Sequence, residues 1–131
     1  MDAVFKNMRI AIPSEDGNGL ESNVSMHFGR CKYYTFIDIE DGKIKGTEVV
    51  KVPFEEHGYG DLPNFVKKNG ANLVIAYGMG ARAIDYFNEL GIDVITGVSG
   101  KIKDVIKKFL EGTLSIDERW KEHGDFGLHE H

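Results

Sequence analysis

The chain has 131 residues, 41% hydrophobic and 28% charged, a composition typical of one soluble globular domain. Its formal net charge of -5 argues against a surface that attracts nucleic acid or anionic lipid, and no apolar run approaches the about 20 residues of a membrane span. The only cysteine, Cys31, excludes an intrachain disulfide and a cysteine-rich zinc site within one chain. We therefore expect a cytoplasmic protein with neither a nucleic-acid nor a membrane partner.

The N-terminal part predicts three strands and one long loop. Residues 1–7 lack the apolar segment of a secretory signal and are expected to form a flexible leader. Residues 8–13 are mostly apolar and end at a proline, which predicts a short strand. The stretch 14–30 is rich in Gly, Asn, Ser and Asp, and loops of this length are usually functional or mobile. Two β-compatible segments, 33–39 and 43–52, flank an Asp-Gly turn and predict an antiparallel hairpin.

The remaining chain predicts helices alternating with strands. Asp61 and Ser99 are expected to N-cap the first and last helix, and a glycine is expected to end each helix. The elements are a helix from Asp61 to the stop at Gly70, a strand over 72–77, a helix over 80–90, a strand over 92–96 and a helix from Ser99 to the stop at Gly112. The last helix carries an apolar stripe of Ile102, Val105, Ile106, Phe109 and Leu110.

The predicted order of elements is βββαβαβα. Strand-helix-strand units require parallel pairing with a right-handed crossover, whereas the hairpin is antiparallel. The fold class expected is therefore α/β, with a mixed five-stranded sheet flanked by helices in the three-layer ribonuclease H-like arrangement. The first strand has no acid where nucleases of that fold need metal-binding carboxylates, which excludes nuclease activity. Residues 113–131, with three of the five histidines, are expected to form a partly ordered tail.

Two glycine-rich turns, 78–82 and 97–100, follow predicted strands and open predicted helices. Both should lie at the carboxyl ends of parallel strands, where exposed N–H groups and the helix dipole favour an anion. The candidate cofactor-binding residues in these turns are Gly78, Met79, Gly80 and Ser99. The alternative is that the glycines only make tight turns. A dinucleotide site is disfavoured, because no acidic residue ends the next strand to hold a ribose.

The end of the first loop brings an imidazole, a guanidinium and a thiol together in Met26-His27-Phe28-Gly29-Arg30-Cys31. His27 and Cys31 are candidate metal ligands, with His57 of the second polar loop as a third. Arg30 is a candidate to neutralise an anionic cluster or to donate hydrogen bonds to its sulfides. The alternative is that Cys31 is a small buried hydrophobe and His27 a surface residue. The sequence contains no nucleophile elbow, no P-loop and no H-E-x-x-H motif, which favours a protein that is not an enzyme.

Several segments resemble the dinitrogenase iron-molybdenum cofactor biosynthesis family. They are, in order, MRIAIPS at 8–14, SMHFGR at 25–30, FID at 36–38, HG at 57–58 and VIAYGMGARA at 74–83, followed by LGI at 90–92. The resemblance runs from about residue 8 to 110, within a domain expected at 8–112. It implies a ribonuclease H-like fold and carriers that hold the iron-molybdenum cofactor or its iron-sulfur precursors without catalysing a reaction. It also implies a cluster pocket formed by His27 and Arg30, facing Gly78 and Gly80.

The leading hypothesis is a carrier that holds an iron-molybdenum or related metal-sulfur cluster between the loop 14–31 and the turn 78–82. Its partners would be the cluster and cofactor-assembly proteins, and the chain would be a monomer or a weak homodimer. A second hypothesis is a protein-interaction or regulatory module with no metal cargo. A third is an enzyme acting on a small anion, for which His27, His57 or Asp61 would be the general acid or base.

Overall fold

The computed structural model describes residues 7–53 and 60–116, and the structural statements below refer to these residues. The elements in chain order are β1 (Asn7–Ser14), η2 (Gly19–Glu21), η3 (Phe28–Arg30), β2 (Tyr33–Glu40), β3 (Lys43–Lys51), α1 (Asp61–Lys68), β4 (Leu73–Ile75), α2 (Ala81–Glu89), β5 (Asp93–Ile95) and α3 (Ile102–Glu111), where η marks a short 3-10 helix. The predicted order βββαβαβα is confirmed. The expected leader and most of the expected tail lie outside the described residues.

The five strands form one mixed sheet in the order β3-β2-β1-β4-β5. β1 and β2 pair antiparallel, as do β2 and β3, whereas β4 pairs parallel with both β1 and β5. This is the mixed five-stranded sheet of the predicted ribonuclease H-like fold. Because β1, β4 and β5 run in the same direction, their carboxyl ends open at one edge of the sheet.

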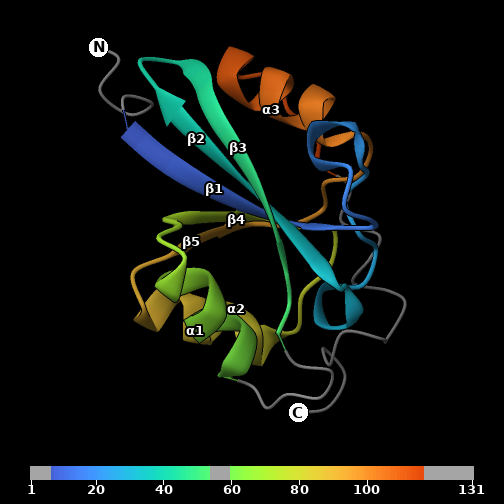
Figure 1. The fold of residues 1–131 in the computed structure, drawn as a ribbon. Coiled ribbons are helices and arrows are strands. Elements are labelled where there is room, and N and C mark those ends of the chain that lie inside the picture. The colour runs from blue at the N-terminus through green and yellow to red at the C-terminus, as the bar shows by residue number, and fades with distance from the viewer. Residues whose placement is uncertain (1–6, 54–59, 117–131) are drawn as a thin grey trace.

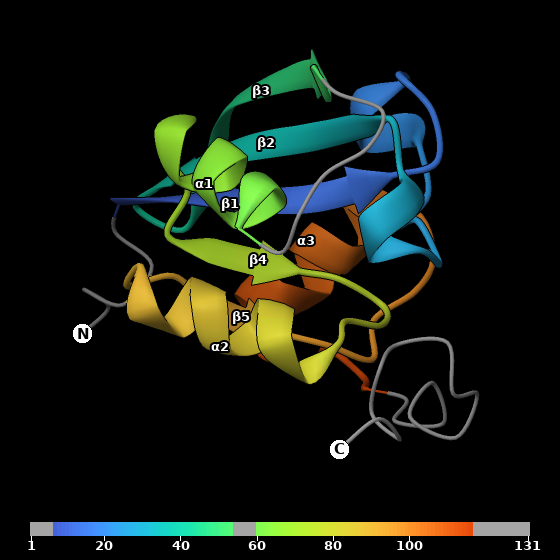
Figure 2. The ribbon, with the colours of Figure 1, turned by 90° about the horizontal axis from the view of Figure 1, so that it is seen from below.

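Helices cover both faces of the sheet, which gives the three predicted layers. α3 lies on one face and α1 and α2 on the other, as Figures 1 and 2 show. Side chains of β1 alternate between these layers: Ala11 packs on the side of α1 and α2, and Ile10 and Ile12 on the side of α3. The predicted stripe of α3 faces this second core. Among the described helices, none is long and apolar enough to cross a membrane.

Local turn chemistry accounts for the hairpin and for the end of the last helix. Asp41 and Gly42 have φ angles of 55° and 78°, the left-handed conformation that a tight two-residue hairpin requires. Gly112 follows α3 with φ 76° and ψ 20°, so it is the predicted left-handed C-cap. The predicted Asp-Gly hairpin turn and the predicted end of the last helix at a glycine are therefore confirmed.

The two predicted N-caps are wrong. Gly60 holds the N-cap position of α1, and Asp61 is already the first helical residue. α3 begins only at Ile102, so Ser99 lies before the helix. The reason for the late start is tertiary: Ile102 N–H donates to the Ser22 carbonyl at 2.9 Å, which pairs the start of α3 with the backbone of the long loop.

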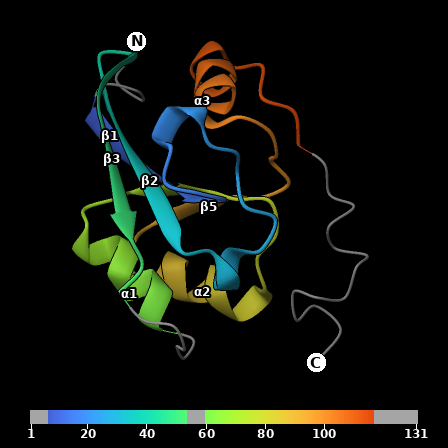
Figure 3. The ribbon, with the colours of Figure 1, turned by 45° about the vertical axis from the view of Figure 1, so that its right-hand side comes forward.

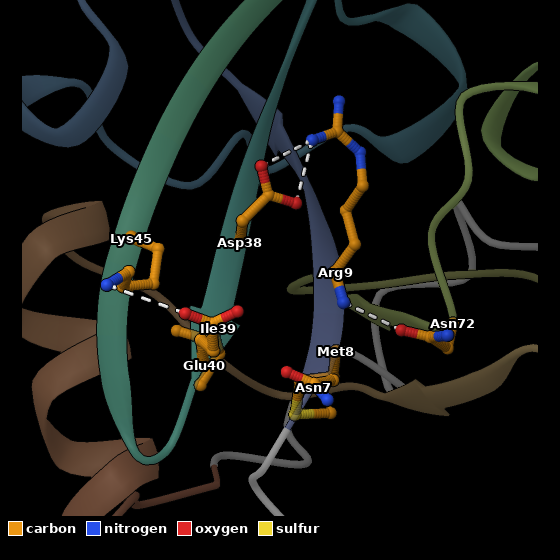
Figure 4. Close-up of a pocket in the computed structure, with 8 residues that line it drawn as sticks. All are labelled: Asn7, Met8, Arg9, Asp38, Ile39, Glu40, Lys45 and Asn72. Carbon is orange, nitrogen blue, oxygen red and sulfur yellow. Dashed lines mark hydrogen bonds and ion pairs between the residues drawn. The ribbon is translucent and has the colours of Figure 1, made fainter.

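Arg9 of β1 connects β2 and β3 at the opposite edge of the sheet, and Figure 4 shows its pairing with Asp38. Its guanidinium donates to both carboxylate oxygens of Asp38 on β2 at 2.9 Å and to Glu48 on β3 at 2.6 Å. Its Nε donates to the Asn69 carbonyl at 2.8 Å. An open pocket of about 340 Å³ lies here, lined by Asn7, Met8, Arg9, Asp38, Ile39, Glu40, Lys45 and Asn72. The charges in this region are paired with one another, which indicates a structural role.

We predict that Arg9→Met lowers the free energy of unfolding by about 1–2 kcal/mol, because it removes the shared donor and leaves two carboxylates unpaired. Lys45→Met is the control, since the exposed Lys45–Glu40 pair at 3.4 Å should contribute no more than about 0.5 kcal/mol. Urea unfolding of both variants measures the difference. Equal effects would show that the Arg9 network contributes no more than an ordinary surface pair.

Candidate functional site

The long loop after β1 and the turn after β4 meet at the carboxyl edge of the parallel strands, a common position for ligands in α/β sheets. Phe28 of η3 packs edge-on against Phe87 of α2, with ring centroids 5.8 Å apart. Phe28 and Met79 also belong to the same core cluster. Figure 3 shows the loop running from beneath α3 towards α2. The fold therefore packs η3 against α2.

The turn that opens α2 has unused hydrogen-bond donors. Within the described part of the chain, the N–H groups of Gly78, Met79 and Gly80 donate no hydrogen bond. Gly78 and Met79 are nonetheless buried, and buried backbone N–H groups are nearly always paired. Gly80 is the N-cap of α2 and supplies no side-chain cap, and the first turn of α2 carries no acidic residue. This turn therefore combines free donors with the positive end of a helix dipole.

The second glycine-rich turn differs in that its first two N–H donors are already used. Gly97 N–H donates to the Tyr77 carbonyl at 2.7 Å, and Val98 N–H donates to the Ala76 carbonyl at 3.2 Å. The loop 14–31 also lies across the start of α3, where Asn23 and Lys101 form a β-bridge. The candidate Ser99 lies in this turn and is exposed. It is therefore a weaker candidate for an anion contact than the turn before α2.

His27 and Cys31 occupy the two ends of η3, as N-cap and C-cap. The His27 N–H donates to the Ser25 hydroxyl at 3.1 Å, and the Arg30 N–H donates to the His27 carbonyl at 3.2 Å. Phe28 is buried in the core, whereas His27 and Arg30 are exposed. The motif thus has one buried anchor and two side chains that are accessible to a ligand.

Cys31 is only partly exposed, and its sulfur donates a hydrogen bond to the Phe28 carbonyl at 3.4 Å. Burial raises the pKa of the Cys31 thiol to about 12 and outweighs nearby hydrogen bonds that favour the thiolate. The thiol is therefore protonated at neutral pH. Because metals bind the thiolate, a metal ion at Cys31 must displace this proton.

The remaining candidate residues are Met79 and His57. The Met79 side chain is fully buried, so only the backbone of Met79 is available to a ligand. The candidate His57 lies outside the described residues. Among the residues that are described, no three His, Cys, Asp or Glu side chains are grouped closely enough to hold one metal ion.

Sequence reasoning missed Met26, which precedes His27 and is 41% exposed. An exposed methionine next to a histidine presents a soft thioether to a ligand. The available signal was a methionine directly before the histidine in a loop rich in Gly, Asn, Ser and Asp.

Comparisons with known proteins agree on one family and one fold. The sequence profile of the family described as dinitrogenase iron-molybdenum cofactor matches residues 6–112. Uncharacterized protein MJ0580 of Methanocaldococcus jannaschii is 35% identical over 112 residues, which cover 83% of this chain and 91% of that protein. The crystal structure of PH0822 is 59% identical, has a TM-score of 0.82, and covers 86% of this chain and 99% of its own. The apo form of the orange protein from Desulfovibrio gigas shares the fold, at 21% identity and a TM-score of 0.70 over 85% of this chain and 93% of that one.

The chemistry of Cys31 leads to a prediction about its reactivity. With a pKa of about 12, only about one thiol in 10⁵ is ionised at pH 7, against a few per cent for an ordinary cysteine. Alkylation by iodoacetamide should therefore be at least about a hundredfold slower in the folded protein than in urea, and it should accelerate with rising pH. Mass spectrometry of the single cysteine follows both rates. Equal rates in the two states would contradict the buried, protonated thiol.

Proposed function

Since the chain belongs to the dinitrogenase iron-molybdenum cofactor family, we propose that it is a non-catalytic carrier for an anionic metal-sulfur cluster. The cargo is the iron-molybdenum cofactor or a related iron-sulfur or molybdenum-sulfur cluster, held between the loop 14–31 and the turn 78–82. The observation that supports this most directly is the row of N–H groups at 78–80 without acceptors in the described chain. Sulfides of a cluster would supply those acceptors.

The charge around the turn favours an anion, although the whole chain is acidic. The N-terminus of α2 carries the positive end of the helix dipole, and Arg82 adds a positive charge in the first turn. Arg30 is exposed on η3, which packs against α2. A guanidinium presents several N–H donors in a fixed plane, which suits a cluster with several sulfur acceptors.

Metal ligands for the cargo come from the loop. The exposed His27 offers an imidazole, a ligand for iron and other transition metals. Cys31 offers a softer sulfur after it loses its proton, and Met26 lies beside His27 with an exposed thioether. We propose His57 as a further ligand from the second polar loop. With few protein ligands and many hydrogen bonds, the cluster would be held firmly but remain transferable to cofactor-assembly proteins.

This function requires reversible binding and no bond-making in the cargo, so the proposed carrier is not an enzyme. We place it in the cytoplasm, as a monomer or a weak homodimer. The competing hypothesis, an interaction module without cargo, uses the same loops but predicts no metal on the purified protein. Anaerobic incubation with iron, sulfide and molybdate distinguishes these two hypotheses.

Cluster binding is tested by anaerobic incubation of the full chain with iron, sulfide and molybdate, followed by gel filtration, visible absorption and elemental analysis. We expect a coloured complex of fixed stoichiometry. His27→Ala and Arg30→Ala should each retain about tenfold less metal, because each removes a direct contact. Lys107→Ala on α3 is the charge-matched control and should retain the wild-type amount. A colourless, metal-free wild-type protein would refute the carrier proposal.

The donor turn is tested separately at Gly80, whose φ of -66° already suits proline. Gly80→Pro deletes one N–H without demanding a new φ, whereas Gly80→Ala keeps the N–H and adds only a methyl group. We expect Gly80→Pro to weaken cluster retention about tenfold relative to Gly80→Ala, since a charge-assisted hydrogen bond is lost. Circular dichroism checks that both variants are folded. Equal retention by the two folded variants would exclude this N–H as a cluster contact.

A further inference from the structure

Ser25 lies at the point where the long loop turns into η3. It is only 7% exposed, although it belongs to a loop rich in polar residues. Its N–H donates to the Pro13 carbonyl at 2.8 Å, which joins its backbone to β1, the central strand. Its hydroxyl accepts the His27 N–H at 3.1 Å and donates to the His27 carbonyl at 3.3 Å. One buried side chain therefore binds both backbone groups of His27.

The His27 carbonyl is also the group that closes η3. It accepts the Arg30 N–H at 3.2 Å, and short 3-10 turns need such support because their own hydrogen bonds have poor geometry. His27 is the N-cap of η3, but its side chain makes no capping hydrogen bond. The backbone from which the exposed His27 and Arg30 side chains extend therefore depends on a carbonyl that Ser25 also binds.

The buried Phe28 fixes only one side of this turn. Its ring anchors η3 in the core, with centroids 6.4 Å from the ring of Tyr34 and 5.8 Å from that of Phe87. One anchored side chain leaves the chain that enters the turn free to rotate about its own dihedral angles. Ser25 adds a second fixed point on the other side of His27. The two points together restrict the φ of -127° and the ψ of 94° of His27.

We propose that Ser25 is a positioning residue for the cargo, because it fixes the backbone from which the His27 imidazole and the Arg30 guanidinium reach the cluster. The inference rests on the proposed function and adds to that site a residue that does not touch the cargo. Side chains that hold a metal ligand in place raise its affinity, and their loss typically costs about tenfold or more. Contacts that are fixed before binding also lose less entropy when the cargo arrives.

Ser22 offers a matched control in the same loop. It is also a buried serine, 1% exposed, and its hydroxyl accepts the Asp16 N–H at 3.2 Å. The same hydroxyl donates to the carbonyls of Asp16 at 3.4 Å and Asn23 at 3.5 Å, and it makes no hydrogen bond to His27. Ser22→Ala and Ser25→Ala therefore delete the same atom from similar surroundings, and only Ser25→Ala breaks a contact with His27.

The first test is anaerobic incubation of the full-length variants with iron, sulfide and molybdate. Ser25→Ala should retain about tenfold less metal than the wild type, whereas Ser22→Ala should retain the wild-type amount. Ser25→Thr keeps the hydroxyl and should restore retention. Thermal unfolding checks that all three variants are folded. Wild-type retention by Ser25→Ala, an equal loss in Ser22→Ala, or no rescue by a folded Ser25→Thr would overturn the inference.

The second test needs no cargo. Amide hydrogen exchange of the metal-free protein, followed by NMR, reports on the Arg30 N–H, whose acceptor is the His27 carbonyl. Exchange should be about fivefold faster in Ser25→Ala, because the turn loses a supporting hydrogen bond, and unchanged in Ser22→Ala. Equal rates in the wild type and both variants would overturn the inference. If the wild type retains no cluster, the carrier proposal fails, and this rate still decides whether Ser25 fixes the turn.

Discussion

β1 pairs antiparallel with β2 over its eight residues and parallel with β4, and the two cores of the molecule meet on its two faces. This double pairing fixes the directions of β2 and β4 relative to β1, and β3 and β5 then pair with those two strands. It also requires the chain to leave β1 at the edge where β4 and β5 end. The loop 14–31 therefore leaves the sheet at the edge where the turn before α2 also lies, and its η3 packs against α2.

The two glycine-rich turns show how tertiary structure separates similar sequences. Both follow a parallel strand and open a helix, yet the loop 14–31 covers the start of α3 and leaves the N–H groups before α2 without acceptors. Tertiary hydrogen bonds thus decide which backbone donors of a glycine-rich turn remain open, because the Tyr77 and Ala76 carbonyls accept from Gly97 and Val98. The local charge acts in the same direction, because the first turn of α2 lacks an acid while Asp104 lies in the first turn of α3.

The sequence predicted the elements whose signals are local. The Asp-Gly turn, the apolar stripe of α3 and the glycine that ends α3 all act within a few residues, and all three were right. Ser99 failed as a cap because a carbonyl distant in sequence, that of Ser22, pairs with the start of α3. The unpaired hydroxyl of the buried Tyr34 was not predictable either. It depends on how η3 joins β2, and no periodicity describes a turn of three residues.

Unsatisfied groups at the candidate site have a thermodynamic consequence for the proposed carrier. The empty protein bears the cost of the unpaired N–H groups before α2. A cargo that pairs them stabilises the folded state, by about 2.7 kcal/mol when its free concentration is a hundred times its Kd. The same groups lose their partners when the cargo leaves. Polar groups kept unpaired in the empty protein therefore lower its stability and favour the loaded state, and release of the cluster restores that cost.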